Sequence, residues 1–482
     1  MTPLSAPTST PTPWWGIIPF VVMLLAIALL PLIRSTAHAW EKNRNKLLLA
    51  LVLGIPVALW MAVDHGVLHV THALWEYVSF IMLLLSLFTV SGGIYLSGDL
   101  RATPRNNTVI LGIGAIVASF IGTTGASMLL IRPLLRANSE RHHIKHTVVF
   151  FIFTVSNCGG LLTPLGDPPL FLGLLRGVPF MWTFTLFPEW LLVNGLLLAT
   201  YYALDRRNYE SESRDDLALD AATATPLRVH GAFNMIYLAM IVAAVALAPS
   251  INIDKLAEGT ATLAEAVPWR ELIMLAATVL SFVTGDKVAR FKGNQFSWGP
   301  ILEVAALFIG IFLTMMPALL FLKEVAPKLP LNTIGFYLSA GSLSSVLDNA
   351  PTYATFFEIA RALGPSVGGE LVAGVPVMFL TAISLGSVFF GAMTYVGNGP
   401  NFMVKAVAEH SGIEMPHFGG YVVWAFRYLF PILIANMLVF LAGGIWTWVG
   451  VALGVALLGQ ALWLRRSAAP VPEEHKRIHV DD

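Results

Sequence analysis

Charged residues are scarce in this chain. Asp, Glu, Lys and Arg make up 12% of its 482 residues, about half of their usual share of roughly 25% in soluble domains. The 29 basic and 29 acidic residues cancel, so net charge gives no reason to expect a nucleic-acid partner. With 56% hydrophobic residues and a mean hydropathy of +0.72, the composition argues against a soluble enzyme and predicts an all-α polytopic membrane protein.

The chain also has very little cysteine, and no basic residues stand at its N-terminal end. Cys158 is the single cysteine, which excludes a disulfide framework within one chain. No Lys or Arg precedes the first apolar run, so the basic start of a secretory signal is absent. We therefore expect residues 17–33 to be retained as a first transmembrane helix.

Long apolar segments, by contrast, recur along almost the whole chain. A helix needs about 17–25 residues to cross roughly 30 Å of hydrocarbon. Two apolar segments, 107–137 and 332–362, are broken in the middle by the polar strings GTTGAS and LDNAPT, and we expect each to form a re-entrant hairpin. We expect eleven transmembrane helices besides, at residues 17–33, 45–63, 74–97, 147–175, 182–203, 230–248, 269–285, 300–322, 371–408, 420–443 and 444–464.

Basic residues in the short loops predict the orientation. The loop after the first helix carries Arg34, Lys42, Arg44 and Lys46, whereas the next loop, 64–71, has no Lys or Arg. The first loop is therefore expected on the cytoplasmic side of the inner (cytoplasmic) membrane. It follows that the N-terminus lies outside, the C-terminus is cytoplasmic, and the two hairpins enter from opposite faces.

The two halves of the chain share a motif. GDPPLF at 166–171 matches GNGPNF at 397–402, an offset of 397 − 166 = 231. The hairpin strings align at residues 124 and 348, an offset of 348 − 124 = 224, and their opposed entry makes the repeats inverted. Inverted repeats with broken helices in corresponding positions are typical of secondary transporters with a site near the membrane midplane. The alternative is chance similarity between Gly- and Pro-rich helix breaks.

These features divide the chain into five parts. A polar, acidic segment at 204–229 separates the halves, and we expect it to be a solvated cytoplasmic loop. The expected parts are the N-terminal tail and first span (1–39), the first inverted repeat (40–203), the cytoplasmic linker (204–229), the second inverted repeat (230–443), and the last span with a cytoplasmic tail (444–482).

Two acids lie inside broken apolar segments. Asp167 is followed by prolines that forbid a continuous helix, and Asp348 lies at the second hairpin tip. A carboxylate at membrane depth is costly and points to function. The breaks add hydroxyl and amide oxygens but no Lys or Arg, and such oxygens suit Na⁺ or another hard cation. The predicted ion-binding residues are Asp167, Asp348, Thr124, Ser127, Ser156, Asn157, Asn349, Thr352, Asn398 and Asn401.

Burial also favours the protonated form of a carboxyl group when no cation is bound. Cation and proton would then compete for the same oxygens, as in an exchanger, although acids that merely cap broken helix ends are the alternative. Glu303, near the start of an apolar run, is either part of a proton path or an interfacial acid. His65, His69 and His72 share one helical face that could bind metal or sense pH, but a wet interfacial face is the commoner explanation.

Four longer strings carry a resemblance to a known family: SNCGGLLTPLGDPPLFLGLLRGVPF (156–180), LFIGIFLTMMPAL (307–319), LSSVLDNAPTYATFF (343–357) and GAMTYVGNGPNFMVKA (391–406). They closely resemble the NhaD-type sodium:proton antiporters of the ion transporter superfamily, where such sequences are often filed under a citrate-transporter domain heading. The resemblance covers roughly residues 40–445 and implies a scaffold domain, a transport domain, a homodimer and an elevator-like movement. It also implies that the cation and the proton bind Asp167 and Asp348, supported by Ser156, Asn157, Asn349, Thr352 and Asn398.

The hairpin tips depart from the dicarboxylate carriers of the same superfamily. Those carriers have a Ser-Asn-Thr tripeptide at both tips to hold carboxylate groups, whereas the tips here read GTTGAS and LDNAPT. This difference counts against citrate. The sequence therefore predicts a transporter without a cofactor that exchanges Na⁺, or Li⁺, for H⁺ and serves pH homeostasis. The alternatives are a Na⁺-coupled citrate or dicarboxylate importer and, less favoured, an arsenite permease.

Overall fold

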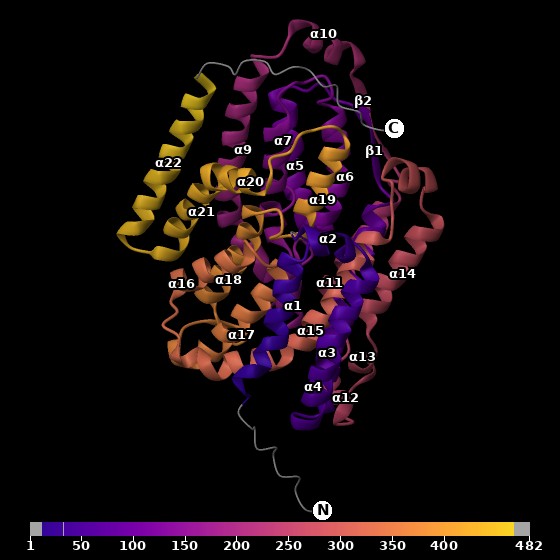
Figure 1. The fold of residues 1–482 in the computed structure, drawn as a ribbon, viewed down its shortest axis with the longest axis vertical. Helices are drawn as coiled ribbons and strands as arrows, with labels where there is room; N and C mark the ends of the chain where they lie inside the picture. The colour runs from indigo at the N-terminus through magenta and orange to yellow at the C-terminus, as the bar shows by residue number, and fades with distance from the viewer. Residues whose placement is uncertain (1–11, 32, 467–482) are drawn as a thin grey trace, which may run out of the picture.

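The protein is described by a computed structural model that covers residues 12–31 and 33–466 (Figure 1). Within these ranges the chain is mainly helical, with two short two-stranded sheets, which confirms the prediction of an all-α polytopic membrane protein. The N-terminal tail up to residue 11 and the tail from residue 467 lie outside the described residues. Seven helical stretches in the described part are long and apolar enough to cross a membrane: Asn43–Asp64, Val67–Ser91, Lys145–Leu162, Phe180–Tyr209, Gly299–Val325, Phe418–Ala442 and Ile445–Arg466.

The other four predicted spans fall on shorter helices. Residues 17–33 correspond to Trp14–Leu29, and residues 371–408 correspond to Val377–Met393 followed by a separate helix. The spans at 230–248 and 269–285 correspond to α11 (Asn234–Leu247) and α14 (Trp269–Thr284). Every predicted crossing therefore contains a helix, although four of these helices are shorter than a full bilayer crossing. Residues 163–167, 371–376 and 394–398, which lie within predicted crossings, are not helical.

One group of helices, the first bundle, consists of α1 (Ile18–Leu29), α3 (Asn43–Asp64), α4 (Val67–Ser91), α11, α14 and α15 (Gly299–Val325), which pack against one another. Small residues let α3 and α15 approach closely, since a Cβ atom on Gly310 would lie 2.7 Å from the Cβ atom of Ala50. Aromatic packing joins α4 to α15 through Phe80 and Phe308, whose ring centroids are 4.8 Å apart.

The remaining long helices form the second bundle. It contains α5 (Pro104–Ile121), α6 (Thr123–Arg136), α7 (Lys145–Thr154), α8 (Pro168–Leu175), α9 (Phe187–Tyr209), α16 (Thr333–Ser344), α17 (Asn349–Val367), α18 (Val377–Phe390), α19 (Gly399–His410), α20 (Phe418–Trp424), α21 (Phe430–Met437) and α22 (Ile445–Arg466). The pairs α5–α6 and α16–α17 are the two predicted hairpins. In Figure 1, α5 and α6 lie in the upper half of the molecule and α16 and α17 in the lower half, so the hairpins enter from opposite ends.

Short elements complete the chain. The helices among them are α2 (Arg34–Trp40), α10 (Arg214–Thr223), α12 (Ile253–Ala257) and α13 (Leu263–Ala266), and the strands are β1 (Tyr95–Asp99), β2 (Thr225–His230), β3 (Leu371–Val372) and β4 (Val375–Pro376). Single turns of 3₁₀- or π-helix lie at Trp14–Ile17, Cys158–Leu162, Phe180–Leu186, Ala289–Gly293, Ala326–Lys328, Gly391–Met393, Ala425–Leu429 and Leu438–Ala442.

The segment 204–229 is ordered and does not form the solvated loop that its composition suggests. Helix α9 continues to Tyr209, and Ser213 caps α10 by accepting a hydrogen bond from the main-chain N–H of Asp216 at 3.0 Å. Strand β2 then pairs antiparallel with β1. Local capping and pairing with a distant strand therefore give this polar segment a fixed structure, while its role as the boundary between two domains stays a prediction.

Candidate functional site

The two broken helices have the same backbone geometry. A Cβ atom on Gly166 would lie 2.1 Å from the carbonyl oxygen of Gly160, and a Cβ atom on Gly397 would lie 2.6 Å from that of Gly391. Both pairs of glycines obey the offset predicted from the sequence, since 391 − 160 and 397 − 166 both equal 231. Only glycine permits this close approach of two backbone segments, so each break is fixed by a matched pair of glycines.

The residue that starts the second half of each broken helix is equally matched. Asp167 precedes α8 with φ −145° and ψ 142°, and Asn398 precedes α19 with φ −152° and ψ 141°. Neither side chain caps its own helix. Both side chains are therefore available to groups on other segments, and one is an acid where its counterpart is an amide.

Asp167 lies where the four predicted breaks meet. Its side chain is 1% exposed and accepts three hydrogen bonds. The donors are Thr123 Oγ1 of the first hairpin tip at 3.0 Å, Asn349 Nδ2 of the second tip at 2.5 Å, and Asn398 Nδ2 of the second broken helix at 3.1 Å. Since each donor comes from a different segment, one carboxylate joins both hairpins and both broken helices.

Four helices begin at this point. Helices α6, α8, α17 and α19 start at Thr123, Pro168, Asn349 and Gly399, and the free N–H groups of a helix N-terminus carry partial positive charge. Together with the three donors, these helix ends stabilise a negative charge on Asp167, although no Lys or Arg bonds to it in the described part of the chain. The arrangement suits a buried carboxylate that has to be charged during part of its working cycle.

A second layer of polar side chains holds the broken helices together. Asn157 donates to Asn401 Oδ1 at 2.6 Å and accepts from Asn398 Nδ2 at 3.2 Å. Ser127 and Ser156 share a hydrogen bond of 2.7 Å between their hydroxyl oxygens. All five of these side chains are buried. The sequence therefore identified residues that do lie together, but most of them position Asp167 and its neighbours and do not contact its carboxylate.

Asp348 has different surroundings. It is only partly buried, and its Oδ1 accepts the main-chain N–H of Ala350 at 3.0 Å, which caps α17. Thr352 donates its hydroxyl to the main-chain oxygen of Asp348 at 3.1 Å. Helix starts relate Asp348 to Gly122, the residue before α6, at an offset of 348 − 122 = 226. The sequence alignment with Thr124 was thus two residues away from the structural correspondence.

A cavity of about 70 Å³ opens beside Asp167, between the two bundles. Asp167 is the one charged residue among its lining residues, and Thr124 lines it as well. The other walls are mainly apolar: α4 contributes Leu83, Leu84, Leu87 and Phe88, and α15 contributes Pro300, Ile301 and Val304. The space suffices for a few water molecules or a small ion but is far below the roughly 300–1,000 Å³ of typical organic-ligand pockets.

Asn349 contributes an oxygen that has no use within the protein. Its Nδ2 donates to Asp167, while its Oδ1 is buried and has no hydrogen-bond partner among the described residues. An unpaired buried acceptor costs free energy unless a ligand compensates it. This amide oxygen and the Asp167 carboxylate are the kind of ligands that hard cations prefer.

Glu303 forms an ion pair with the buried Lys46 at 2.5 Å between α15 and α3, and it does not line the cavity, so its role in a proton path stays a prediction. His72 pairs with Asp254 at 2.8 Å. The residue missed by sequence reasoning is Thr123, and the signal was the preceding Gly122, whose φ of +81° fixes where α6 begins.

Comparison with known proteins assigns the chain to a family. A family model described as "Putative citrate transport" matches residues 9–441. No curated protein matches the chain. The family match spans both hairpins and both broken helices, and it agrees with the membrane-helical fold. The chain therefore belongs to this citrate-transport family and is a citrate-transporter-like member of the ion transporter superfamily, a multi-pass membrane protein of secondary-transporter type.

Proposed function

We propose that this protein exchanges Na⁺, or Li⁺, for H⁺, and that the cation binds Asp167. The observation that carries the proposal is the position of Asp167: a buried carboxylate held by three donors from three segments, beside the unpaired Oδ1 of Asn349 and a small cavity. A small dehydrated cation would satisfy both oxygens. The other expected features, namely a homodimer in the inner membrane with its N-terminus outside, belong to the same proposal.

Competition between the two ions follows from burial. An empty, charged Asp167 is unfavourable in a site without Lys or Arg, so the carboxyl group is stable when it carries either a cation or a proton. Two loaded states and a disfavoured empty state are what an exchanger needs. Asp348, which is partly exposed at the second hairpin tip, is the second proposed acid and is better placed to exchange protons with water.

Na⁺-coupled import of citrate or a dicarboxylate is the second candidate. The family description favours it, and so do the four helix N-termini, because such ends attract anions. Two features oppose it: Asp167 already occupies the point where these ends converge, and the cavity has no cationic lining residue. A multiply charged carboxylate would therefore meet a fixed negative charge in a space of about 70 Å³.

Reconstituted protein separates the two candidates. The interior of proteoliposomes that contain a pH-sensitive dye should become more alkaline when NaCl is added outside, because Na⁺ enters in exchange for H⁺, and Asp167→Asn should abolish this response. Asp254→Asn, which neutralises an exposed acid on α12, is the control and should retain it. Full activity of Asp167→Asn would refute the role of this carboxylate. Uptake of radiolabelled citrate driven by a Na⁺ gradient, without a Na⁺-evoked pH change, would favour the importer.

A further inference from the structure

The chain passes between the two bundles three times. It does so at β1 between α4 and α5, at residues 210–233 between α9 and α11, and at residues 326–332 between α15 and α16. The first two passages lie at the same end of the molecule (Figure 1) and pair with each other as the β1–β2 ribbon. We call this ribbon, together with the strap formed by residues 211–223, the clasp. A relative movement of the bundles has to be accommodated at all three passages, two of which belong to the clasp.

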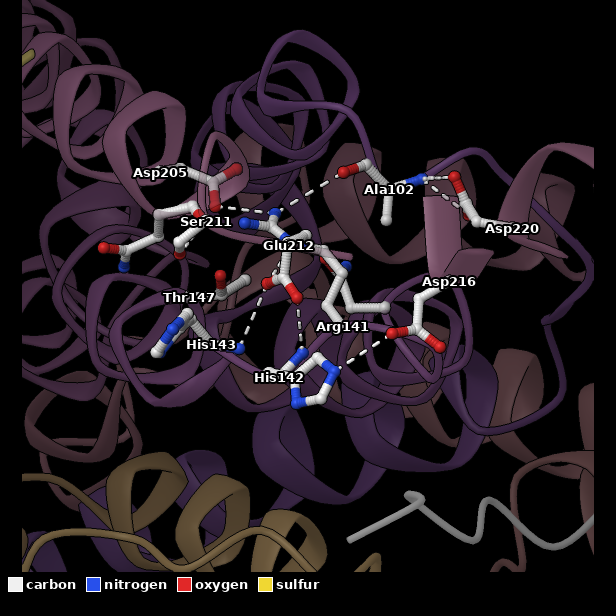
Figure 2. A network of polar contacts seen from close by, with 12 residues as sticks. Ala102, Arg141, His142, His143, Thr147, Asp205, Ser211, Glu212, Asp216 and Asp220 are labelled. Carbon is white, nitrogen blue, oxygen red and sulfur yellow. Dashed lines mark hydrogen bonds and ion pairs between the residues drawn. The ribbon is translucent and has the colours of Figure 1, made fainter. Parts of the chain in front are cut away.

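Acidic side chains hold the strap against the rest of the second bundle, as Figure 2 shows. Glu212 accepts the main-chain N–H of His142 at 2.9 Å, and the imidazole of His142 contacts Asp216 Oδ2 at 3.0 Å. Asp220 accepts the main-chain N–H of Ala102 at 3.0 Å. Three carboxylates along the strap therefore attach it to the rest of the protein. Two of them contact the segment before α7, and the third contacts the segment before α5.

Arg141 anchors one end of this arrangement permanently. Its side chain is 1% exposed and pairs with Asp205 at 2.7 Å and with Glu212 at 3.4 Å. A guanidinium group stays charged at any physiological pH, so this contact does not respond to protons. A response to pH has to arise elsewhere in the clasp.

The ribbon itself contains an unbalanced acidic group. Asp99, at the end of β1, is partly buried, and its Oδ1 has no hydrogen-bond partner among the described residues. Burial, and repulsion by Glu140 and Asp220, raise the pKa of Asp99 to about 6, while Arg136 acts in the opposite direction. The charged groups that face Asp99 and Asp220 are Glu140 and Arg141 of the loop before α7, Arg136 of α6 and Arg101 before α5.

The sign of the effect follows from the raised pKa. Below pH 6 Asp99 is protonated and neutral, and the ribbon carries no repulsion from it. As pH rises through about 6 the carboxyl group ionises beside Glu140 and Asp220, so the clasp loses stability and stays weaker at alkaline pH.

One helix links the clasp to the ion site. At the C-terminal end of α6, Arg136 donates to the hydroxyl oxygen of Tyr95 in β1 at 2.8 Å, and at the N-terminal end Thr123 donates to Asp167. The 14 residues of α6 span about 21 Å at 1.5 Å per residue. Movement of the ribbon can therefore be transmitted to the carboxylate along a single helix.

We propose that the clasp is a cytoplasmic pH switch: it ties the two bundles together at acidic pH and loosens at alkaline pH, which frees the bundles to move and α6 to reposition at the ion site. The switch does not depend on which ion is carried, whereas its effect on turnover rests on the proposed transport function. Asp99 is its proton-sensing residue, and the strap acids are the contacts that it weakens.

Hydrogen–deuterium exchange of the purified full-length protein tests the proposal. Amides in β1, β2 and α10 should exchange faster at pH 8 than at pH 5.5 after correction for the intrinsic pH dependence of exchange. A rise of the pKa from 3.8 to about 6 corresponds to about a hundredfold change over the whole titration, but most of that change occurs below pH 5.5. Between pH 5.5 and pH 8 at most about a fourfold change remains, which we discount to about twofold because Asp99 is partly exposed. Asp99→Asn should remove the difference and keep the ribbon protected at pH 8.

Two further variants make the result decisive. Glu140→Gln removes one repelling neighbour and should reduce the pH difference even if Asp99→Asn folds poorly. Asp215→Asn, on the exposed side of α10, should behave like the wild type. Equal protection at both pH values in the wild type, or an unchanged pH difference in both Asp99→Asn and Glu140→Gln, would overturn the proposal. A pH-dependent clasp in a protein without Na⁺-evoked pH changes would leave the switch intact and refute only the transported ions.

Discussion

Removal of the amide at Asn398 should change the competition between Na⁺ and protons and leave the maximal rate largely intact. The side chain donates to Asp167 Oδ1 at 3.1 Å, and Asn398→Ala deletes this donor. A hydrogen bond to a charged group contributes about 1.5–3 kcal/mol. When Asp167 is charged, with or without a bound cation, the variant loses this stabilising free energy. When Asp167 is protonated, the variant loses much less.

The expected consequence depends on pH in a specific way. Where protons occupy the site, the apparent KM for Na⁺ should rise about 10- to 150-fold, which is the factor that 1.5–3 kcal/mol represents. The pH at which transport is half-maximal should move to the alkaline side by about one to two units. At sufficiently alkaline pH the proton no longer competes, so much of the increase in KM should disappear.

The assay is the Na⁺-evoked pH change in proteoliposomes, measured at a series of Na⁺ concentrations between pH 6 and pH 9. The matched control is Asn436→Ala, because Asn436 is also fully buried but donates to the main-chain oxygen of Glu189 at 3.2 Å. This control should lower thermal stability without moving the pH profile. An unchanged KM in Asn398→Ala, or an increase by the same factor at every pH, would refute the argument that the amide stabilises the charged form.

Two further predictions concern folding. In Gly166→Ala the new Cβ atom would lie 2.1 Å from the main-chain oxygen of Gly160. The variant should therefore yield no folded protein in size-exclusion chromatography. The control, Gly195→Ala, places a Cβ atom where no other atom lies within 4 Å, and it should behave like the wild type. Arg141→Ala removes the guanidinium group from the fully buried Asp205, which keeps only the contact of its Oδ1 with the imidazole of His146 as an ion pair. The variant should lower the free energy of unfolding by about 3 kcal/mol; an unchanged melting temperature would show that the buried pair contributes little.

Much of this site could be predicted because its chemistry is unusual for its surroundings. Prolines after Asp167 exclude a continuous helix, and the matching string before Phe402 gives the offset of 231 that the two glycine pairs obey in the structure. Both signals are local and depend on residue types that have few other uses inside a membrane. The family match and the helical fold agree with this part of the sequence interpretation.

Other details depended on contacts between distant segments. Whether Thr123 or Thr124 contacts Asp167 is decided by the residue at which α6 begins, and one residue of helix turns a side chain by about 100°. The structure of residues 204–229 was equally hidden, because β2 is stabilised by pairing with β1, more than a hundred residues earlier in the chain. A polar composition describes a segment's solubility but not its partners, so a strap was read as a loop.

The pairing of Asp167 with Asn398 limits what the buried part of the site can exchange. These residues occupy equivalent positions of the two repeats, and the Nδ2 atom of Asn398 lies 3.1 Å from the Oδ1 atom of Asp167. Two acids at that distance would force one of them to remain protonated, and two amides would leave no charge for a cation. One acid and one amide give a single negative charge with a built-in donor.

Under the proposed function, Asp167 is neutral in total charge when it carries either Na⁺ or a proton. Exchange at this residue alone therefore moves no net charge across the membrane. Any electrogenic cycle needs a second titrating group. Asp348 is partly exposed and, among the described residues, hydrogen-bonds only at its own helix end, so we propose that it takes or releases that extra proton. Current measurements on Asp348→Asn in a protein that still exchanges Na⁺ for protons would distinguish the two cases, because loss of the current with retained exchange assigns the extra charge to this residue.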